Sequence, residues 1–161
     1  MCAIRIAAAF ILACVLGGPA FADWQYAKWG MTPAEVIEAS AGKAIRDDKP
    51  AANEQGDIIK LRAQHSAGDY QFVVFFKFDQ RADKLTAVQL LLLNPARCDA
   101  LRDELIAKYG SPARTASSSL SKETTWLGAN NNNRIAIIDL GAGALCSLEY
   151  SALSSSSRKG L

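Results

Sequence analysis

Histidine is almost missing from this chain, because His65 is the only one among 161 residues. A Ser-His-Asp or Cys-His mechanism would therefore have to use His65. The sequence has no Gly-x-Ser-x-Gly elbow to place a nucleophile beside it. His65 has the apolar parity of the strand predicted around it, which favours a structural role. A hydrolase that uses His65 is thus the least favoured function.

Metal and nucleotide motifs are missing as well. One histidine and widely separated cysteines do not form a zinc set. The acidic residues of 47–57 lack the ligand spacing and the glycine of a calcium loop. No glycine-rich approach precedes Gly42-Lys43, as a phosphate-binding loop requires. We therefore expect no catalytic residue, no metal site and no cofactor, and predict that the protein is not an enzyme.

Long runs of one charge are also absent. The formal net charge is +2, and cations and carboxylates are interspersed as on an ordinary solvated surface. Residues 1–22 contain one cation, Arg5, and no carboxylate, so the charge without them is +1. A chain so close to neutral has no electrostatic reason to bind nucleic acid.

The N-terminal residues have the pattern of an export signal. Arg5 precedes an apolar run, Ile6 to Val15, and Ala20-Phe21-Ala22 follows it. This is the layout of a secretory signal peptide cleaved after Ala22. Ten apolar residues are about half of what a transmembrane helix needs. We expect a periplasmic protein with no transmembrane segment in the mature chain, and a lipoprotein anchored at Cys14 is the minor alternative.

Cleavage after Ala22 would remove Cys2 and Cys14 and leave Cys98 and Cys146 in an oxidising compartment. Cys98 falls in the first turn of a predicted helix, on its apolar side. Cys146 shares the apolar face of a predicted strand with Leu148. We expect a structural disulfide between them. A redox pair is less favoured without Cys-x-x-Cys spacing, and two free buried thiols are the other alternative.

The clearest local signal is a helix start. Thr32 is a predicted N-cap, Pro33 stands at the first helical position, and Glu35 completes a Thr-x-x-Glu capping box. Gly42 is the predicted glycine after the helix. A second helix is predicted from Pro95 to Tyr109, closed by Gly110.

Alternating apolar residues predict three strands after each helix. These strands are 57–65, 70–78 and 84–93 in the first half, and 122–127, 134–140 and 145–151 in the second. Polar stretches at 43–56 and 113–121 are interpreted as loops. We predict an α+β fold in which an antiparallel sheet of about six strands is packed by two helices, with a helix–β–β–β pattern occurring twice. One domain, 23–153, would contain two similar halves, 23–93 and 94–153, and 154–161 would be a disordered tail.

The residues Trp29-Gly30-Met31-Thr32-Pro33-Ala34-Glu35-Val36, with Gly42 after the helix, support a resemblance, as do Lys108-Tyr109-Gly110-Ser111-Pro112. They resemble small exported bacterial α+β proteins similar to beta-lactamase inhibitory protein and to the small lipoprotein of the outer-membrane barrel-assembly machinery. The resemblance implies binding to other proteins rather than catalysis.

Aromatic residues near the start of the predicted mature chain are the candidate binding surface. For Trp24, Tyr26, Trp29 and Trp126 as a group, filling of the core is the favoured interpretation, and a binding surface is the alternative. Trp24 and Tyr26 share the parity of a strand beside a free N-terminus and are expected to be the most exposed of the group. Trp29 leads into the helix and is expected to be the most buried. Exposed aromatic residues often mark protein contacts. We expect a monomer that binds another envelope protein, with the loops around Asp47 and Asn131 adding contacts.

A binder of a small apolar ligand, held between helices and sheet, is the alternative. The bulky side chains of Phe72, Phe76 and Phe78 would fill such a cavity.

Overall fold

The computed structural model describes residues 23–53, 56–128, 133–141 and 143–153. The predicted leader with its cleavage site after Ala22, Cys14, Asn131 and the predicted tail at 154–161 lie outside these residues. The helices are α1 (Pro33–Ala39), the 3₁₀ turn η1 (Pro95–Arg97) and α2 (Cys98–Tyr109). The strands are β1 (Asp23–Trp24), β2 (Ala27–Lys28), β3 (Ile45–Ala52), β4 (Asp57–Ala67), β5 (Tyr70–Asp79), β6 (Leu85–Leu92), β7 (Arg114–Ser117), β8 (Ser121–Leu127), β9 (Asn133–Leu140) and β10 (Leu145–Ala152).

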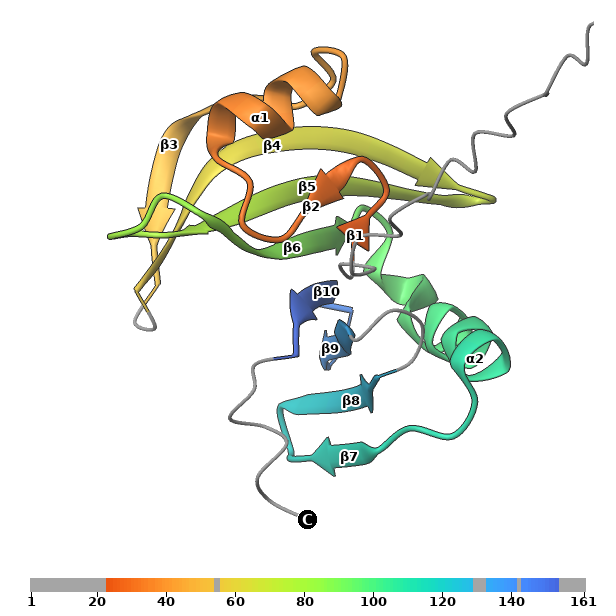
Figure 1. Ribbon diagram of the computed structural model, residues 1–161. Coiled ribbons are helices and arrows are strands. Elements are labelled where there is room, and N and C mark those ends of the chain that lie inside the picture. Colours follow the sequence, from red (N-terminus) through yellow and green to blue (C-terminus); the bar gives the residue numbers. More distant parts are fainter. Residues whose placement is uncertain (1–22, 54–55, 129–132, 142, 154–161) are drawn as a thin grey trace, which may run out of the picture.

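Eight of the strands form one antiparallel sheet, in the order β3-β4-β5-β6-β10-β9-β8-β7 (Figure 1). Within each half, neighbouring strands follow one another along the chain. The two halves meet where β6 pairs with β10 in the middle of the sheet. The remaining two strands, β1 and β2, form a small separate hairpin. Each half therefore contributes one helix and four consecutive strands to the sheet.

The prediction of a six-stranded sheet with helix–β–β–β occurring twice is wrong. The sheet has eight strands, because β3 and β7 lie in the segments that were interpreted as loops. Both are edge strands, and nearly all of their side chains are exposed. An edge strand with no buried face has no reason to alternate apolar and polar residues. The six predicted strands are present, with bounds within two residues of those expected.

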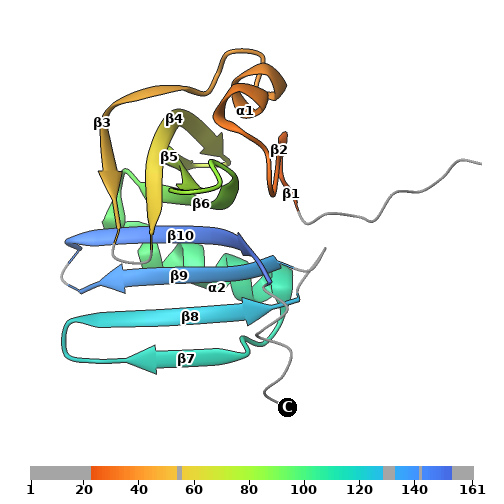
Figure 2. The ribbon, with the colours of Figure 1, turned by 60° about the vertical axis from the view of Figure 1, so that its left-hand side comes forward.

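One face of the sheet is buried, and we call it the covered face. Val36 of α1, Trp24 and Ala27 of the hairpin, and Leu101 and Leu105 of α2 join one continuous core with the side chains of this face. Its buried members are Leu61, Ala63, Phe72, Val74, Phe76, Phe78, Val88, Leu90, Leu92, Trp126, Ile135, Ile137, Cys146 and Leu148. Figure 2 shows α2 behind β9 and β10, with the opposite face of these strands toward the viewer. Within the described residues, no helix has the length and apolarity needed to cross a membrane.

The predicted capping box of α1 is confirmed. Thr32 Oγ1 accepts a hydrogen bond from the Glu35 backbone N–H, and the Glu35 carboxylate accepts one from the Thr32 N–H at 2.7 Å. These bonds to Thr32, through its backbone first and its side chain second, lower the pKa of Glu35. At the other end, Ala41 at φ 52° and Gly42 at φ 79° turn the chain out of the helix. The first left-handed residue is thus Ala41, one position before the predicted glycine.

The capping box accepts hydrogen bonds from backbone N–H groups that have no partner within the helix. Thr32→Ala is therefore expected to lower the free energy of unfolding by about 1 kcal/mol. Urea denaturation followed by far-UV circular dichroism measures this. Thr32→Ser keeps the side-chain oxygen and serves as the matched control, with little expected change. Equal losses for the alanine and serine variants would contradict a role for the cap.

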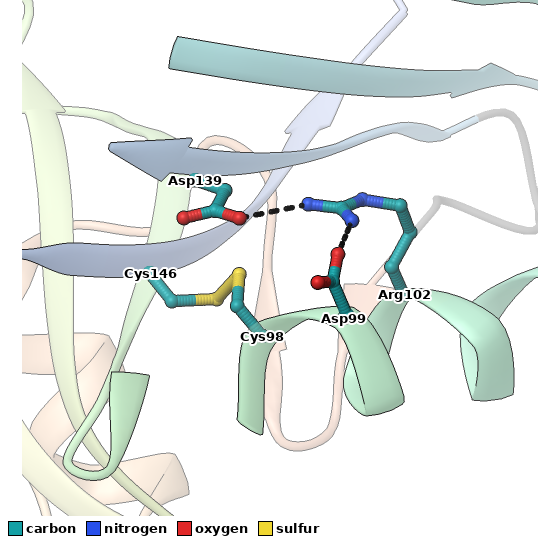
Figure 3. The surroundings of a disulfide bond; sticks show 5 residues. All are labelled: Cys98, Asp99, Arg102, Asp139 and Cys146. Carbon is teal, nitrogen blue, oxygen red and sulfur yellow. Dashed lines mark hydrogen bonds and ion pairs between the residues drawn. A yellow bond between two sulfur atoms is a disulfide. The ribbon is translucent and has the colours of Figure 1, made fainter. Parts of the chain in front are cut away.

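The predicted disulfide is confirmed: Cys98 and Cys146 are bonded, with their Cα atoms 5.7 Å apart. The bond joins the first turn of α2 to β10 (Figure 3). A second tie runs from Arg102 of α2 to Asp139 of β9 at 3.3 Å, and Arg102 also pairs with Asp99 one turn earlier. The disulfide and this ion pair hold α2 on the covered face of the second half.

Candidate functional site: the open face of the sheet

The aromatic residues predicted as candidate partner-binding residues, Trp24, Tyr26 and Trp29, lie in or against the core. Trp24 is only 6 % exposed and belongs to the core, as favoured for the group, so the expectation that it is among the most exposed of the four is wrong. Its ring packs edge-on against Tyr26, His65 and Phe76, at centroid distances of 6.0, 5.5 and 6.0 Å. Trp24 lies on β1, whereas Tyr26 lies in the turn of the hairpin, so the two do not share a strand. The expected strand parity fails because the chain reverses at Gln25, whose φ is 53°.

Tyr26 and Trp29 are half-buried against the same core. The indole N–H of Trp29 donates to the side-chain oxygen of Asn133 at 2.9 Å, which links the start of the described chain to β9. Burial raises the pKa of the Tyr26 hydroxyl. Asp47, expected in a contact loop, lies within strand β3. These positions hold the hairpin and the sheet edge in place rather than gathering into one exposed patch.

His65 lies on the covered face, half-buried, beside the hairpin. The Gln25 amide nitrogen is 3.2 Å from both of its ring nitrogens. Among the described residues, no serine, cysteine or carboxylate forms a hydrogen bond with His65, and no group of three metal-ligating side chains gathers. Burial lowers the pKa of His65 and so favours its neutral form. The surroundings of His65 therefore contain no acid–base or nucleophilic partner for it.

The opposite side of the sheet, which we call the open face, carries no helix or hairpin among the described residues, although its small side chains Ala87, Ala136 and Ser147 are buried between larger neighbours. Its side chains form rows that run across the strands. One row is Gln64–Val73–Leu91–Ser147–Ile138–Glu123–Ala116, the next is Arg62–Phe75–Gln89–Glu149–Ala136–Thr125–Arg114, and a shorter one is Lys77–Ala87–Ser151–Arg134–Leu127. Side chains opposite each other in such rows touch their neighbours and form a continuous surface.

A ladder of alternating charges crosses the open face. Lys77 Nζ lies 2.7 Å from Glu149, Arg134 lies 3.7 Å from the same carboxylate, and Arg134 also lies 2.8 Å from Glu123. Thr125 donates to the Glu123 carboxylate at 3.1 Å. The side-chain exposure rises along the ladder from 14 % at Lys77 to 40 % at Glu123. Such a network neutralises itself, so a partner can cover it with less desolvation cost than isolated charges would require.

Apolar side chains stand on both sides of this ladder. Val73, Phe75, Leu91 and Ile138 are all half-buried, although no described element packs over them. Next to them, over β3–β5, the surface is hollowed by about 540 Å³ between Ile45, Arg62, Gln64 and Val73. Ile45 is 51 % exposed. The open face thus combines apolar contact area, a shallow hollow and compensated charge.

A signal for this face was present in the sequence. In β5, the residues between the buried ones are Val73, Phe75 and Lys77, so the strand is apolar on both sides rather than on one. A two-sided apolar strand indicates that its second face meets something as well. What the sequence does not contain is the pairing of β6 with β10, which brings the two halves of this surface together.

Comparisons with protein-family models, with curated proteins and with solved structures found no match to the chain. The resemblance of residues 29–36 and 108–112 to small exported binding proteins therefore stays a prediction from the sequence.

Proposed function

We propose that this protein is a non-catalytic binding protein of the cell envelope, and that it holds another protein against the open face of its sheet. The observation that carries the proposal is the uncovered eight-stranded face with half-buried Phe75, Val73 and Leu91 around a compensated charge ladder. Partly exposed apolar side chains within a polar frame are typical of protein interfaces.

The dimensions of the face suit a specific interface. Eight strands at a spacing of about 4.8 Å span roughly 34 Å. A standard interface buries about 800 Å² on each partner, which corresponds to a patch roughly 28 Å across. The rigid hydrogen-bonded strands present this area with little ordering cost on binding.

Charge favours an acidic partner. Along the rows, the cations Arg62, Lys77, Arg134 and Arg114 outnumber the carboxylates Glu149 and Glu123. Lys77 and Arg134 are engaged in the ladder, and Arg62 lies 3.3 Å from the Asp48 carboxylate, which leaves Arg114 near one end of the central row. We infer a partner that places apolar side chains over Phe75 and a carboxylate near Arg114.

Placement in the envelope is part of the proposal. The leader-like residues 1–22 and the Cys98–Cys146 bond both support an oxidising compartment. The resemblance of residues 29–36 to exported binding proteins supports the same assignment. We also propose that the protein is a monomer, because a monomer leaves its open face free to bind a different protein.

Photo-crosslinking in the native cell envelope tests the proposal. A benzoyl-phenylalanine in place of Phe75 is expected to give one adduct of defined mass, because the probe keeps an aromatic ring on the open face. The matched control carries the same probe at Ile106, which is 38 % exposed on α2. Adducts of equal yield at both positions, or none at Phe75, would count against the open face as the binding surface.

The captured partner then allows a quantitative prediction. Phe75→Ser is expected to weaken its binding by about tenfold or more, as for an aromatic side chain at the centre of an interface. Isothermal titration calorimetry measures the affinity, and a thermal melt verifies that the variant is folded. Ile106→Ser, which removes a partly exposed aliphatic side chain outside the face, should leave the affinity unchanged. Unchanged affinity in Phe75→Ser would remove this function.

A further inference from the structure

A second hollow lies on the covered face, between the β1–β2 hairpin and α2. Its volume is about 520 Å³, within the range of about 300–1,000 Å³ usual for small-molecule sites. Phe72, Leu90 and Leu148 of the three central strands line its floor. Trp24 of the hairpin and Leu101 of α2 line opposite walls. The cavity exists because the hairpin and the helix both stand on the sheet with a gap between them.

The apolar interior carries hydroxyl groups. Tyr150 and Tyr109 both line the cavity. Burial, first, and the adjoining Tyr109 hydroxyl raise the pKa of Tyr150 well above its ordinary value. The Tyr150 hydroxyl is therefore held in its protonated form beside Tyr109. Burial also keeps His65, at the hairpin end of the cavity, neutral.

Charged side chains of α2 stand at the mouth of this cavity. Lys108 and Glu104 of α2 are exposed and line it, which places them at its mouth. The Glu104 carboxylate already accepts the Tyr70 hydroxyl at 2.7 Å. Lys108 Nζ lies 5.0 Å from the ring centroid of Tyr109, and among the described residues no carboxylate lies within 4.0 Å of it. The ammonium of Lys108 therefore remains as a charged donor, whereas the Gln25 amide nitrogen already lies 3.2 Å from the ring nitrogens of His65.

We propose that this cavity binds a small apolar carboxylate, with its ring or short alkyl chain over Phe72, Leu90 and Leu148 and its acid group at Lys108. The floor residues offer the apolar part of the ligand a hydrophobic surface. A carboxylate at the mouth can form a charge-assisted hydrogen bond with the Lys108 ammonium, which is weaker for a neutral group and absent for a cationic one. This ligand site lies on the opposite side of the sheet from the open face, so it does not depend on the proposed protein-binding function.

Three ligands with the same alkyl chain test the chemistry of the head group. Decanoate, decanol and decylamine are titrated into the purified protein with its disulfide intact, and the fluorescence of Trp24 and the other tryptophans is recorded. We expect saturable binding of one decanoate per chain, weaker binding of decanol and the weakest binding of decylamine. No saturable binding of decanoate, or binding of decylamine as tight as that of decanoate, would overturn the proposal.

A substitution at the mouth of the cavity tests whether decanoate binds there. Lys108→Gln is expected to weaken decanoate by about tenfold while changing decanol less than about twofold, because only the charged hydrogen bond is lost. Lys122→Gln on β8 is the matched control, since that exposed lysine does not line the cavity. Leu148→Trp, which fills the floor, should abolish binding of decanoate and decanol if its thermal melt shows it folded. An unchanged decanoate affinity in Lys108→Gln would overturn the assignment of the acid group to this mouth.

Discussion

Loss of the Cys98–Cys146 bond is expected to lower the free energy of unfolding by about 4 kcal/mol. The bond closes a loop with a sequence separation of 48 residues. In the chain-entropy account, a cross-link of this span removes about 4 kcal/mol of conformational entropy from the unfolded state. Since small domains are stable by only about 5–15 kcal/mol, this is a large part of the total. Urea unfolding of the protein with and without dithiothreitol measures the loss.

The other tie between α2 and the sheet cannot replace the disulfide. Arg102 is 4 % exposed, and its Nε has no hydrogen-bond partner among the described residues. Of its two carboxylate partners, Asp99 is 81 % exposed and Asp139 is 21 % exposed. A buried guanidinium that is incompletely paired regains little beyond its desolvation cost. The position of α2 therefore rests on the disulfide together with Leu101 and Leu105.

A double variant, Cys98→Ala with Cys146→Ala, separates the bond from side effects of the reductant. Its stability should match that of the reduced wild-type protein within about 1 kcal/mol, and dithiothreitol should not change it further. If the reduced protein and the double variant are both as stable as the oxidised protein, the bond does not constrain the unfolded chain as argued here.

The elements that the sequence predicts well are those with a strong local signal. Strand β5 alternates from Tyr70 to Phe78 because every second side chain is buried, and α1 begins with a capping box that satisfies its own donors. The strand β3 escapes prediction for the opposite reason. It pairs with β4 through Ile45–Arg46 and Ala51–Ala52 only, and its register shifts between Arg46 and Ala51. Charged residues and Pro50 in that interruption protect an edge from further pairing, and they have the composition of a loop.

Both proposed sites depend on contacts between distant parts of the chain. The apolar residues of the open face can be assigned from strand parity, but the pairing of β6 with β10 cannot, because nothing local encodes it. The cavity was expected to be filled by Phe72, Phe76 and Phe78. Only Phe72 lines it, since Phe76 and Phe78 are fully buried elsewhere on the covered face. The cavity arises from the position of the β1–β2 hairpin on the sheet, and strands of two residues contain too little sequence pattern to predict this position.

Trp24→Ala is expected to lower the free energy of unfolding by about 3–5 kcal/mol, the usual cost of removing a buried aromatic side chain. Trp24 is 6 % exposed, and its ring meets the rings of Tyr26, His65 and Phe76. The β1–β2 hairpin pairs through only two residues on each side, so its backbone hydrogen bonds alone cannot hold it on the sheet. Without the indole, the hairpin loses the contact that fixes it over β4 and β5. Equilibrium unfolding in urea measures the change.

A neighbouring substitution shows whether the effect belongs to the ring. Lys28→Ala lies in the same hairpin, on an exposed side chain, and should change stability by less than about 0.5 kcal/mol. Trp24→Phe keeps an aromatic ring and should lose clearly less than Trp24→Ala. If Trp24→Ala instead keeps full stability but abolishes capture of the partner, the indole contacts the partner, as the sequence alone suggests, and the interface includes the hairpin. The other outcome is that Trp24→Ala is less stable but its folded fraction still captures the partner. The open face then remains the interface, because a core residue can support a binding surface without being part of it.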